Sequence, residues 1–199
     1  FVEQSQPKNF LMKRIAIFAS GSGTNAENII TYFQKNTKAK VVLVLSNNPK
    51  ALVLERASKL GVQNGVFNKQ QLNDSKWAIE NLKNLDLIVL AGFLWKFPEH
   101  LLENYKNKVV NVHPALLPKY GGKGMYGMHV HNAVVENKEA ESGITIHYVN
   151  ENYDKGAIIF QAKCAVNNTD TPSDVAAKIH QLEMTHFPEV VQQILSENG

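Results

Sequence analysis

The chain has little of the features that mark several specialised protein classes. Its 199 residues contain one cysteine, Cys164, so we expect a core that forms without disulfides or a structural metal. No apolar run reaches the roughly 18 residues of a membrane helix, and no signal-peptide core precedes a small-residue cleavage site near the start. These absences predict a cytoplasmic protein that does not act at a membrane.

Neither sign of charge is in large excess. Lysine and arginine number 21 against 18 aspartates and glutamates, a formal net charge of +3 that is scattered along the chain. This bias is too weak to indicate a nucleic-acid partner, and it fits a small anionic ligand at least as well. The seven histidines, including His129 and His131, show no metal-ligand spacing, so no metal is expected.

Strand and helix patterns alternate through the first half of the chain, which predicts an α/β fold. Helical patterns begin near residue 26 and cover 51–60, 75–84 and 98–105. The short apolar segments that predict strands cover residues 15–19, 41–45, 62–67, 85–91 and 109–112. Such alternation implies a doubly wound, mostly parallel, Rossmann-like sheet with helices on both faces.

The second half predicts a different pairing. A helix is expected over 130–137, and segments 144–149 and 157–166 are joined by a connection short enough to make them antiparallel neighbours. A closing helix begins after Thr171, and Pro188 is expected to kink or restart it. Residues 1–12 lack a pattern and are treated as an N-terminal extension, which leaves 13–199 as a single domain.

A glycine-rich turn, Ser20-Gly-Ser-Gly-Thr-Asn25, lies between the first strand and the first helix. It satisfies the loose dinucleotide fingerprint, but the second strand ends in Leu45-Ser-Asn-Asn-Pro49 and lacks the acid that holds a ribose. No Gly-Lys-Ser/Thr of a Walker loop follows either. The favoured interpretation is a phosphate monoester held by backbone amides, Thr24 and Asn25; the alternative is a structural tight turn.

A second candidate site is Asn111-Val-His-Pro114, at the carboxyl end of a central strand. Asn111 and His113 are two residues apart, so both side chains emerge on one face and can direct two donors at one oxygen. That arrangement predicts an oxyanion site at the edge where open α/β sheets bind ligands. The alternative is a histidine that only caps the sheet edge.

The third candidate is Asp154, in the turn before Lys155 and Gly156. A carboxylate beside His113 would stabilise the imidazolium and raise the histidine pKa. An aspartate in such a turn usually serves the turn alone, and the residues by themselves do not bring the two side chains together.

Six short stretches from Met12 onward carry a family resemblance. They are Ser20-Gly-Ser-Gly-Thr-Asn25, Leu90-Ala-Gly-Phe-Leu94, Asn111-Val-His-Pro-Ala-Leu-Leu-Pro-Lys119, Ser142-Gly-Ile-Thr-Ile-His-Tyr-Val149, Asp154-Lys-Gly156 and Gln161-Ala-Lys163. Together they resemble the folate-dependent phosphoribosylglycinamide formyltransferase family. The Asn-x-His-Pro-x-Leu-Leu-Pro element is shared with methionyl-tRNA formyltransferases and formyltetrahydrofolate hydrolases.

The resemblance implies a reaction and its catalytic residues. The amine of phosphoribosylglycinamide would attack the formyl carbon of the co-substrate 10-formyltetrahydrofolate directly, without a covalent enzyme intermediate. Asn111 and protonated His113 would stabilise the oxyanion, while Asp154 would keep His113 charged and help relay protons.

The resemblance also implies binding residues. Gly23, Thr24 and Asn25 would hold the substrate phosphate, Glu183 the ribose hydroxyls, and His180 lies one helical turn before Glu183 on the same side. Lys76 stands near the expected folate tail, where the family often has arginine. The other residues expected at the folate are Leu94, Trp95, Lys96, Phe97, Asn111, Asn150, Glu151, Asn152, Tyr153 and Asp154.

Two further features depart from the family pattern. Trp95 replaces a commonly basic residue and is expected either to stack on the folate or to pack against the protein. The segment 119–128 is longer and richer in glycine than usual. It is either a lid from which Lys119, Lys123 or His129 reaches the phosphoribosyl group, or a flexible insertion.

Other functions fit the sequence less well. A tRNA formyltransferase needs a further RNA-binding domain and the hydrolase a regulatory domain, and neither fits into 199 residues. An amino-sugar-nucleotide formyltransferase would share the core motif, and a non-catalytic folate- or nucleotide-binding module is the alternative from another class. A monomer or a homodimer is expected.

Overall fold

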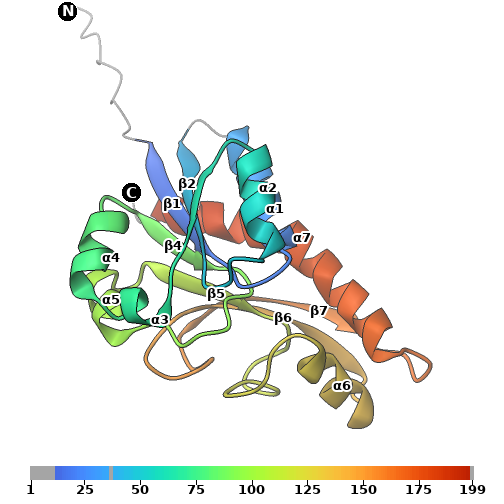
Figure 1. Ribbon diagram of the computed structural model, residues 1–199. Coiled ribbons are helices and arrows are strands. Elements are labelled where there is room, and N and C mark those ends of the chain that lie inside the picture. Colours follow the sequence, from blue (N-terminus) through green and yellow to red (C-terminus); the bar gives the residue numbers. More distant parts are fainter. Residues whose placement is uncertain (1–11, 36–37, 198–199) are drawn as a thin grey trace, which may run out of the picture.

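The structure is a computed structural model that describes residues 12–35 and 38–197. Most of the predicted N-terminal extension, residues 1–11, lies outside the described residues. One seven-stranded sheet forms the centre of the molecule, with helices on either side (Figure 1). The α/β architecture predicted from the sequence is therefore confirmed.

The helices and strands follow the predicted order. The strands are β1 (Lys13–Phe18), β2 (Ala39–Ser46), β3 (Gln63–Val66), β4 (Leu87–Leu90), β5 (Val109–His113), β6 (Glu141–Tyr148) and β7 (Ile158–Ala165). The helices are α1 (Thr24–Gln34), α2 (Leu52–Lys59), α3 (Lys69–Leu72), α4 (Ser75–Asn81), α5 (Glu99–Asn104), α6 (Met128–Glu136) and α7 (Pro172–Glu197). The four-residue α3, closed by a capping box from Asn68 to Gln71, was not predicted because its pattern is too short to detect.

The sheet order is β3-β2-β1-β4-β5-β6-β7. Strands β1 to β5 pair in parallel, while β6 is antiparallel to both β5 and β7, as the short connection between β6 and β7 predicted. The winding reverses between β1 and β4, so the loops after these two strands separate at a topological switch point. Open α/β sheets bind their ligands in the crevice at such a point.

Two apolar clusters pack the two faces of the sheet. On β1, Ile15 and Ile17 belong to the cluster shared with α1, α2, α6 and α7, whereas Ala16 and Phe18 belong to the cluster shared with α3, α4 and α5. All four side chains are fully buried, as expected for a central parallel strand covered on both faces. This packing fixes the carboxyl ends of β1, β4 and β5 relative to one another.

Helix α7 runs from Pro172 to Glu197 with Pro188 inside it. Of the two expectations, a kink or a restart at Pro188, the restart is therefore wrong. Buried residues on both sides of Pro188, among them Ile179 and Val191, pack on one continuous core. This packing outweighs the lost backbone hydrogen bond. No helix in the described part of the chain is long and apolar enough to cross a membrane.

Candidate functional site

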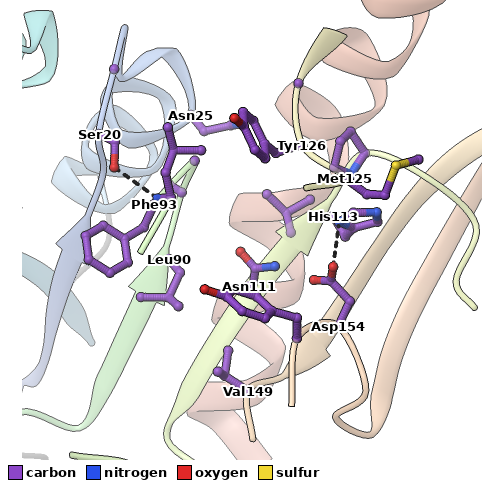
Figure 2. A pocket seen from close by; sticks show the side chains of 18 of the residues that line it. Ser20, Asn25, Leu90, Phe93, Asn111, His113, Met125, Tyr126, Val149 and Asp154 are labelled. Atoms are coloured by element: carbon purple, nitrogen blue, oxygen red, sulfur yellow. Dashed lines mark hydrogen bonds and ion pairs between the residues drawn. The ribbon is translucent and has the colours of Figure 1, made fainter. Parts of the chain in front are cut away.

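A cavity of about 750 Å³ opens at the carboxyl ends of β1, β4 and β5. Figure 2 shows Asn111 at its centre, with Leu90 and Phe93 on one side and His113 and Asp154 on the other. The volume lies within the roughly 300–1,000 Å³ typical of small-molecule sites. Its walls bring together the glycine-rich turn, the end of β5, the turn before Gly156 and the middle of α7, all of which are far apart in sequence.

The glycine-rich turn leads directly into α1. Gly23 precedes the helix with φ of +75°, and a Cβ on it would come within 2.4 Å of the Val53 side chain, so a larger residue does not fit. The Val53 amide donates to the Gly21 carbonyl, and Arg56 Nε donates to the Ser22 carbonyl at 2.9 Å. Helix α2 therefore holds the turn with the free N–H groups of α1 facing the cavity, a geometry suited to a phosphate.

The side chain of Asn25 is engaged with α7. Its Nδ2 donates to Glu183 Oε2 at 2.8 Å, and its buried Oδ1 has no hydrogen-bond partner among the described residues. His180 Nδ1 lies 3.8 Å from Glu183 Oε2, and all three residues line the cavity. Burial raises the pKa of Glu183, although Asn25 and His180 oppose the shift. The structure thus joins the predicted phosphate turn to the residues predicted to contact the ribose.

His113 and Asp154 come together although 41 positions separate them. His113 Nδ1 lies 3.5 Å from Asp154 Oδ2, and His113 is only 3% exposed (Figure 2). The other ring nitrogen, Nε2, donates to the Tyr120 carbonyl at 2.7 Å. Both ring nitrogens therefore face acceptors, an arrangement that suits the charged imidazolium.

Burial lowers the pKa of His113 below its ordinary value, because it outweighs the opposing effects of the Asp154 carboxylate and the Tyr120 carbonyl. Burial acts to raise the pKa of Asp154, but contact with His147, the charge of His113 and the Gly122 amide together lower it. The prediction of a raised pKa for His113 is wrong, because it left out the cost of burial. These pKa directions favour a neutral His113 beside an ionised Asp154.

His147 also belongs to this cluster, although no motif in the sequence pointed to it. It lies directly opposite Asn111 in the pairing of β5 with β6, and its Nε2 is 3.2 Å from Asn111 Nδ2. His147 Nδ1 faces the Tyr148 carbonyl at 2.8 Å, so Nδ1 carries a hydrogen. The same Nε2 is 3.6 Å from Asp154 Oδ1. The sequence signal that could have identified His147 is the presence of a histidine in an otherwise apolar, buried strand.

The glycine-rich segment after β5 contacts the catalytic candidates through its backbone. Besides the Tyr120 carbonyl on His113, the Gly122 amide donates to Asp154 Oδ2 at 2.8 Å. Gly121 allows this approach, since a Cβ there would lie 2.5 Å from Leu117 Cδ2 and 3.3 Å from Asp154 Cβ. The first half of the segment is therefore packed on the site, which disagrees with a plain flexible insertion.

The basic residues of this segment divide into two groups. Lys123 lines the cavity. Lys119 and His129 do not: Lys119 pairs with Glu139 at 3.0 Å, and His129 packs edgewise on Tyr126.

His131, on α6, also lines the cavity. Its side chain is 5% exposed, and its Nδ1 has no hydrogen-bond partner in the described part of the chain. Burial, followed by the charge of His113, lowers the pKa of His131.

Most of the residues expected at the folate line the cavity: Leu94, Trp95, Lys96, Phe97, Asn111, Asn150, Asn152, Tyr153 and Asp154. Trp95 lies edge-on to Phe67 at 6.1 Å, so it packs on the aromatic core and also faces the cavity. Glu151 and Lys76, the latter in the first turn of α4, are exposed and do not line the cavity. Within residues 12–35 and 38–197, no group of three metal-ligating side chains is found.

Comparison with known proteins agrees with this geometry. A sequence model of the formyl transferase family matches residues 13–191. Phosphoribosylglycinamide formyltransferase of Bacillus subtilis is 34% identical over 196 residues, which cover 94% of this chain and 97% of that protein. The chloroplastic enzyme of that name from Arabidopsis thaliana is 36% identical over 193 residues, 93% of this chain but 66% of its own length.

Solved structures give the same result. Glycinamide ribonucleotide transformylase 1 from Geobacillus kaustophilus superposes with a TM-score of 0.84 at 33% sequence identity, covering 93% of this chain and all of that one (100%). The chain therefore belongs to the formyl transferase family, with phosphoribosylglycinamide formyltransferases as its matched relatives.

Proposed function

We propose that the protein transfers the formyl group of 10-formyltetrahydrofolate to the primary amine of N1-(5-phosphoribosyl)glycinamide, a step of purine biosynthesis. The observation that carries the proposal is the placement of Asn111, His113 and Asp154 midway along one cavity. A phosphate-type turn lies at one end and an apolar slot at the other. The names of the matched relatives support the same substrates, and residues 13–199 would act as one formyltransferase domain.

The amine substrate would enter from the side of α1 and α7. Its phosphate would accept hydrogen bonds from the backbone of Gly23, Thr24 and Asn25 at the start of α1. The ribose hydroxyls would donate to Glu183 and to Asn25 Oδ1, which is buried and has no hydrogen-bond partner among the described residues. His180 lies beside Glu183 at the same end. These contacts direct the glycinamide amine toward His113.

The folate would occupy the slot between the loop after β4 and the turn before Gly156. Leu90, Phe97 and Val149 supply apolar walls, and backbone groups around Asn150 and Asn152 supply polar edges for the pterin. Trp95 and Tyr153, which are half-buried and exposed respectively, line the outer part of the slot. The formyl group would then lie next to Asn111.

The proposed chemistry uses the cluster around Asn111. One N–H of the Asn111 amide is held by His147, which leaves the second N–H to donate to the formyl oxygen. As the amine nitrogen bonds to the formyl carbon, this oxygen becomes an oxyanion, and the hydrogen bond to it strengthens. Collapse of the tetrahedral intermediate breaks the bond between the formyl carbon and N10 of the folate.

Proton transfer would involve His113 and Asp154 as a pair. The attacking amine must lose a proton, and N10 must gain one when it leaves. A neutral His113 can take up the amine proton, because Asp154 and the adjacent oxyanion both stabilise the resulting imidazolium. The imidazolium then returns the proton to N10. His113 is therefore neutral again at the end, and no proton is gained or lost overall.

Substrate choice is tested by comparing amines. With 10-formyltetrahydrofolate fixed, formyl transfer is followed spectrophotometrically with phosphoribosylglycinamide and with amino-sugar nucleotides. The proposal expects turnover with the first and none with the second. Turnover only with an amino-sugar nucleotide would replace the amine substrate and keep the folate site, whereas folate binding without turnover on any amine would indicate a binding module.

A further inference from the structure

Tyr120 has a backbone conformation that a large side chain rarely adopts. Its φ is +56°, in the left-handed region, where residues other than glycine are uncommon and bulky ones are outliers. Such a conformation persists only where the surrounding structure holds it. In this conformation the Tyr120 carbonyl accepts the 2.7 Å hydrogen bond from His113 Nε2. The group that holds Tyr120 therefore also holds a contact of a proposed catalytic side chain.

Glu139 is the residue that holds the Tyr120 side chain. The Tyr120 hydroxyl donates to Glu139 Oε1 at 2.8 Å, and Lys119 Nζ donates to both oxygens of the same carboxylate, at 3.0 and 3.2 Å. Hydrogen bonds from Lys119 and Tyr120 lower the pKa of Glu139, while burial, together with Glu139, raises the pKa of Tyr120 to about 12. The carboxylate is therefore ionised and the phenol protonated at neutral pH, so the bond between them persists.

Glu139 is itself fixed to the core of the protein. It lies between α6 and β6, and its amide donates to the Val134 carbonyl at 3.2 Å. Val134 is 1% exposed and belongs to the apolar cluster shared with α6 and α7, against which the Tyr120 side chain also packs. The end of a buried helix thus carries the acceptor, and the tyrosine side chain connects this acceptor to the glycine-rich segment.

The Tyr120 carbonyl also affects which ring nitrogen of a neutral His113 carries the hydrogen. The carbonyl oxygen lies 2.7 Å from Nε2, whereas Asp154 Oδ2 lies 3.5 Å from Nδ1. Only the first distance lies in the range of about 2.7–3.2 Å that is usual for N–H donors, so the geometry favours the hydrogen on Nε2. Nδ1 then has a lone pair and can take up the proton of the attacking amine.

From these contacts we infer that Glu139 is a positioning residue for formyl transfer. Through the Tyr120 hydroxyl it holds the Tyr120 carbonyl against His113 Nε2, which leaves Nδ1 available for the proton. The inference rests on the proposed function, because that function gives His113 the role of the base. Neither Glu139 nor Tyr120 lines the cavity, so Glu139 acts through His113 and does not contact the substrates.

The first test determines the His113 tautomer without any substrate. Nitrogen-15 NMR of the histidine side chains is recorded on the full chain at about pH 8, above the ordinary histidine pKa of 6.5, and His113→Asn identifies the His113 signals. The wild type should have the hydrogen on Nε2. Tyr120→Phe and Glu139→Ala should each lower the ratio of the Nε2–H to the Nδ1–H form by roughly 3- to 10-fold. Glu139→Gln keeps an acceptor oxygen and should resemble the wild type, as should Glu136→Ala, which changes an exposed glutamate of α6.

The second test measures formyl transfer by the same variants. Tyr120→Phe and Glu139→Ala should lower kcat by roughly 3- to 10-fold and leave both KM values unchanged, since neither side chain lines the cavity. The double variant should lose no more than the larger single effect, because the two side chains act through one hydrogen bond. Glu139→Gln and Glu136→Ala should keep the wild-type kcat.

An unchanged His113 tautomer in Glu139→Ala would overturn the positioning role. A loss of kcat in Glu136→Ala as large as that in Glu139→Ala would also overturn it, because the effect would then be a general disturbance of α6. Absence of formyl transfer by the wild type would overturn the proposed function, and the tautomer comparison would still decide whether Glu139 orients His113.

Discussion

His113 donates a 2.7 Å hydrogen bond from Nε2 to the backbone carbonyl of Tyr120. A side chain at the end of β5 is thus oriented by the main chain of the glycine-rich segment that follows it. The next contact along that segment, from the Gly122 amide to Asp154, orients the partner of the same histidine. The segment therefore supports the proposed catalytic pair, and its conformation and the geometry of that pair depend on each other.

Burial of histidines gives the protein a predictable response to pH. The folded pKa of His131 lies below its ordinary value of 6.5, so the unfolded chain binds more protons and stability is lost as pH falls below about 6.5. In urea unfolding at pH 7.5 and 5.5, His131→Gln should lose less stability between the two pH values than the wild type does. His129→Gln, exposed on the same helix, should behave like the wild type. Equal losses in the His131 variant and the wild type would contradict the account.

Asn111 and His147 should act as a unit. Asn111→Ala removes the donor to the oxyanion and is expected to lower kcat by about 10²–10³. His147→Gln changes the group that holds the Asn111 amide and should lower kcat less. The double variant, assayed for formyl transfer, should lose far less than the product of the two single effects. Independent, multiplying losses would show that His147 does not work through Asn111.

Glu183 should affect the amine substrate alone. Glu183→Gln weakens charged hydrogen bonds to the ribose and should raise KM for phosphoribosylglycinamide by about 10- to 100-fold, with the KM for the folate unchanged. Glu189→Gln, exposed on the same helix, is the matched control and should change neither constant. An equal rise of both KM values would indicate a general disturbance of the fold.

Gly23 should be far less replaceable than Gly21. Gly23→Ala forces a side chain into positive φ and against Val53, and it should cost roughly 1–3 kcal/mol of unfolding free energy. At Gly21 a Cβ meets nothing within 4 Å, so Gly21→Ala should leave stability nearly unchanged. Thermal unfolding of the two variants checks this, and equal melting temperatures would show that the turn readily moves away from Val53.

Much of the fold could be predicted because strands such as β4 are continuous apolar runs bounded by turn residues. The sequence also predicted that Asn111 and His113 share a face, since a spacing of two in a strand decides that alone. The short α3 and the continuity of α7 through Pro188 could not be predicted. The pattern of α3 is too short to detect, and the continuity of α7 depends on packing partners distant in sequence.

The same limit applies to the site. The proximity of Asp154 to His113 followed from a family resemblance, because nothing within residues 150–156 indicates which strand end they approach. His147 was missed since its role depends on the register of β6 against β5, which sets it opposite Asn111. The sequence does not tell which of Lys119 and Lys123 lines the cavity. The difference depends on the position of Glu139, which pairs with Lys119 and leaves Lys123 at the cavity.

The central claim is that His113 and Asp154 work together in formyl transfer. The most direct measurement compares wild type, His113→Asn and Asp154→Asn in a spectrophotometric assay with 10-formyltetrahydrofolate and phosphoribosylglycinamide, with folate affinity measured in parallel. The account predicts turnover in the wild type, losses of about 10²–10⁴ in both variants and folate affinity retained in all three. Wild-type turnover that persists undiminished in either variant would contradict it.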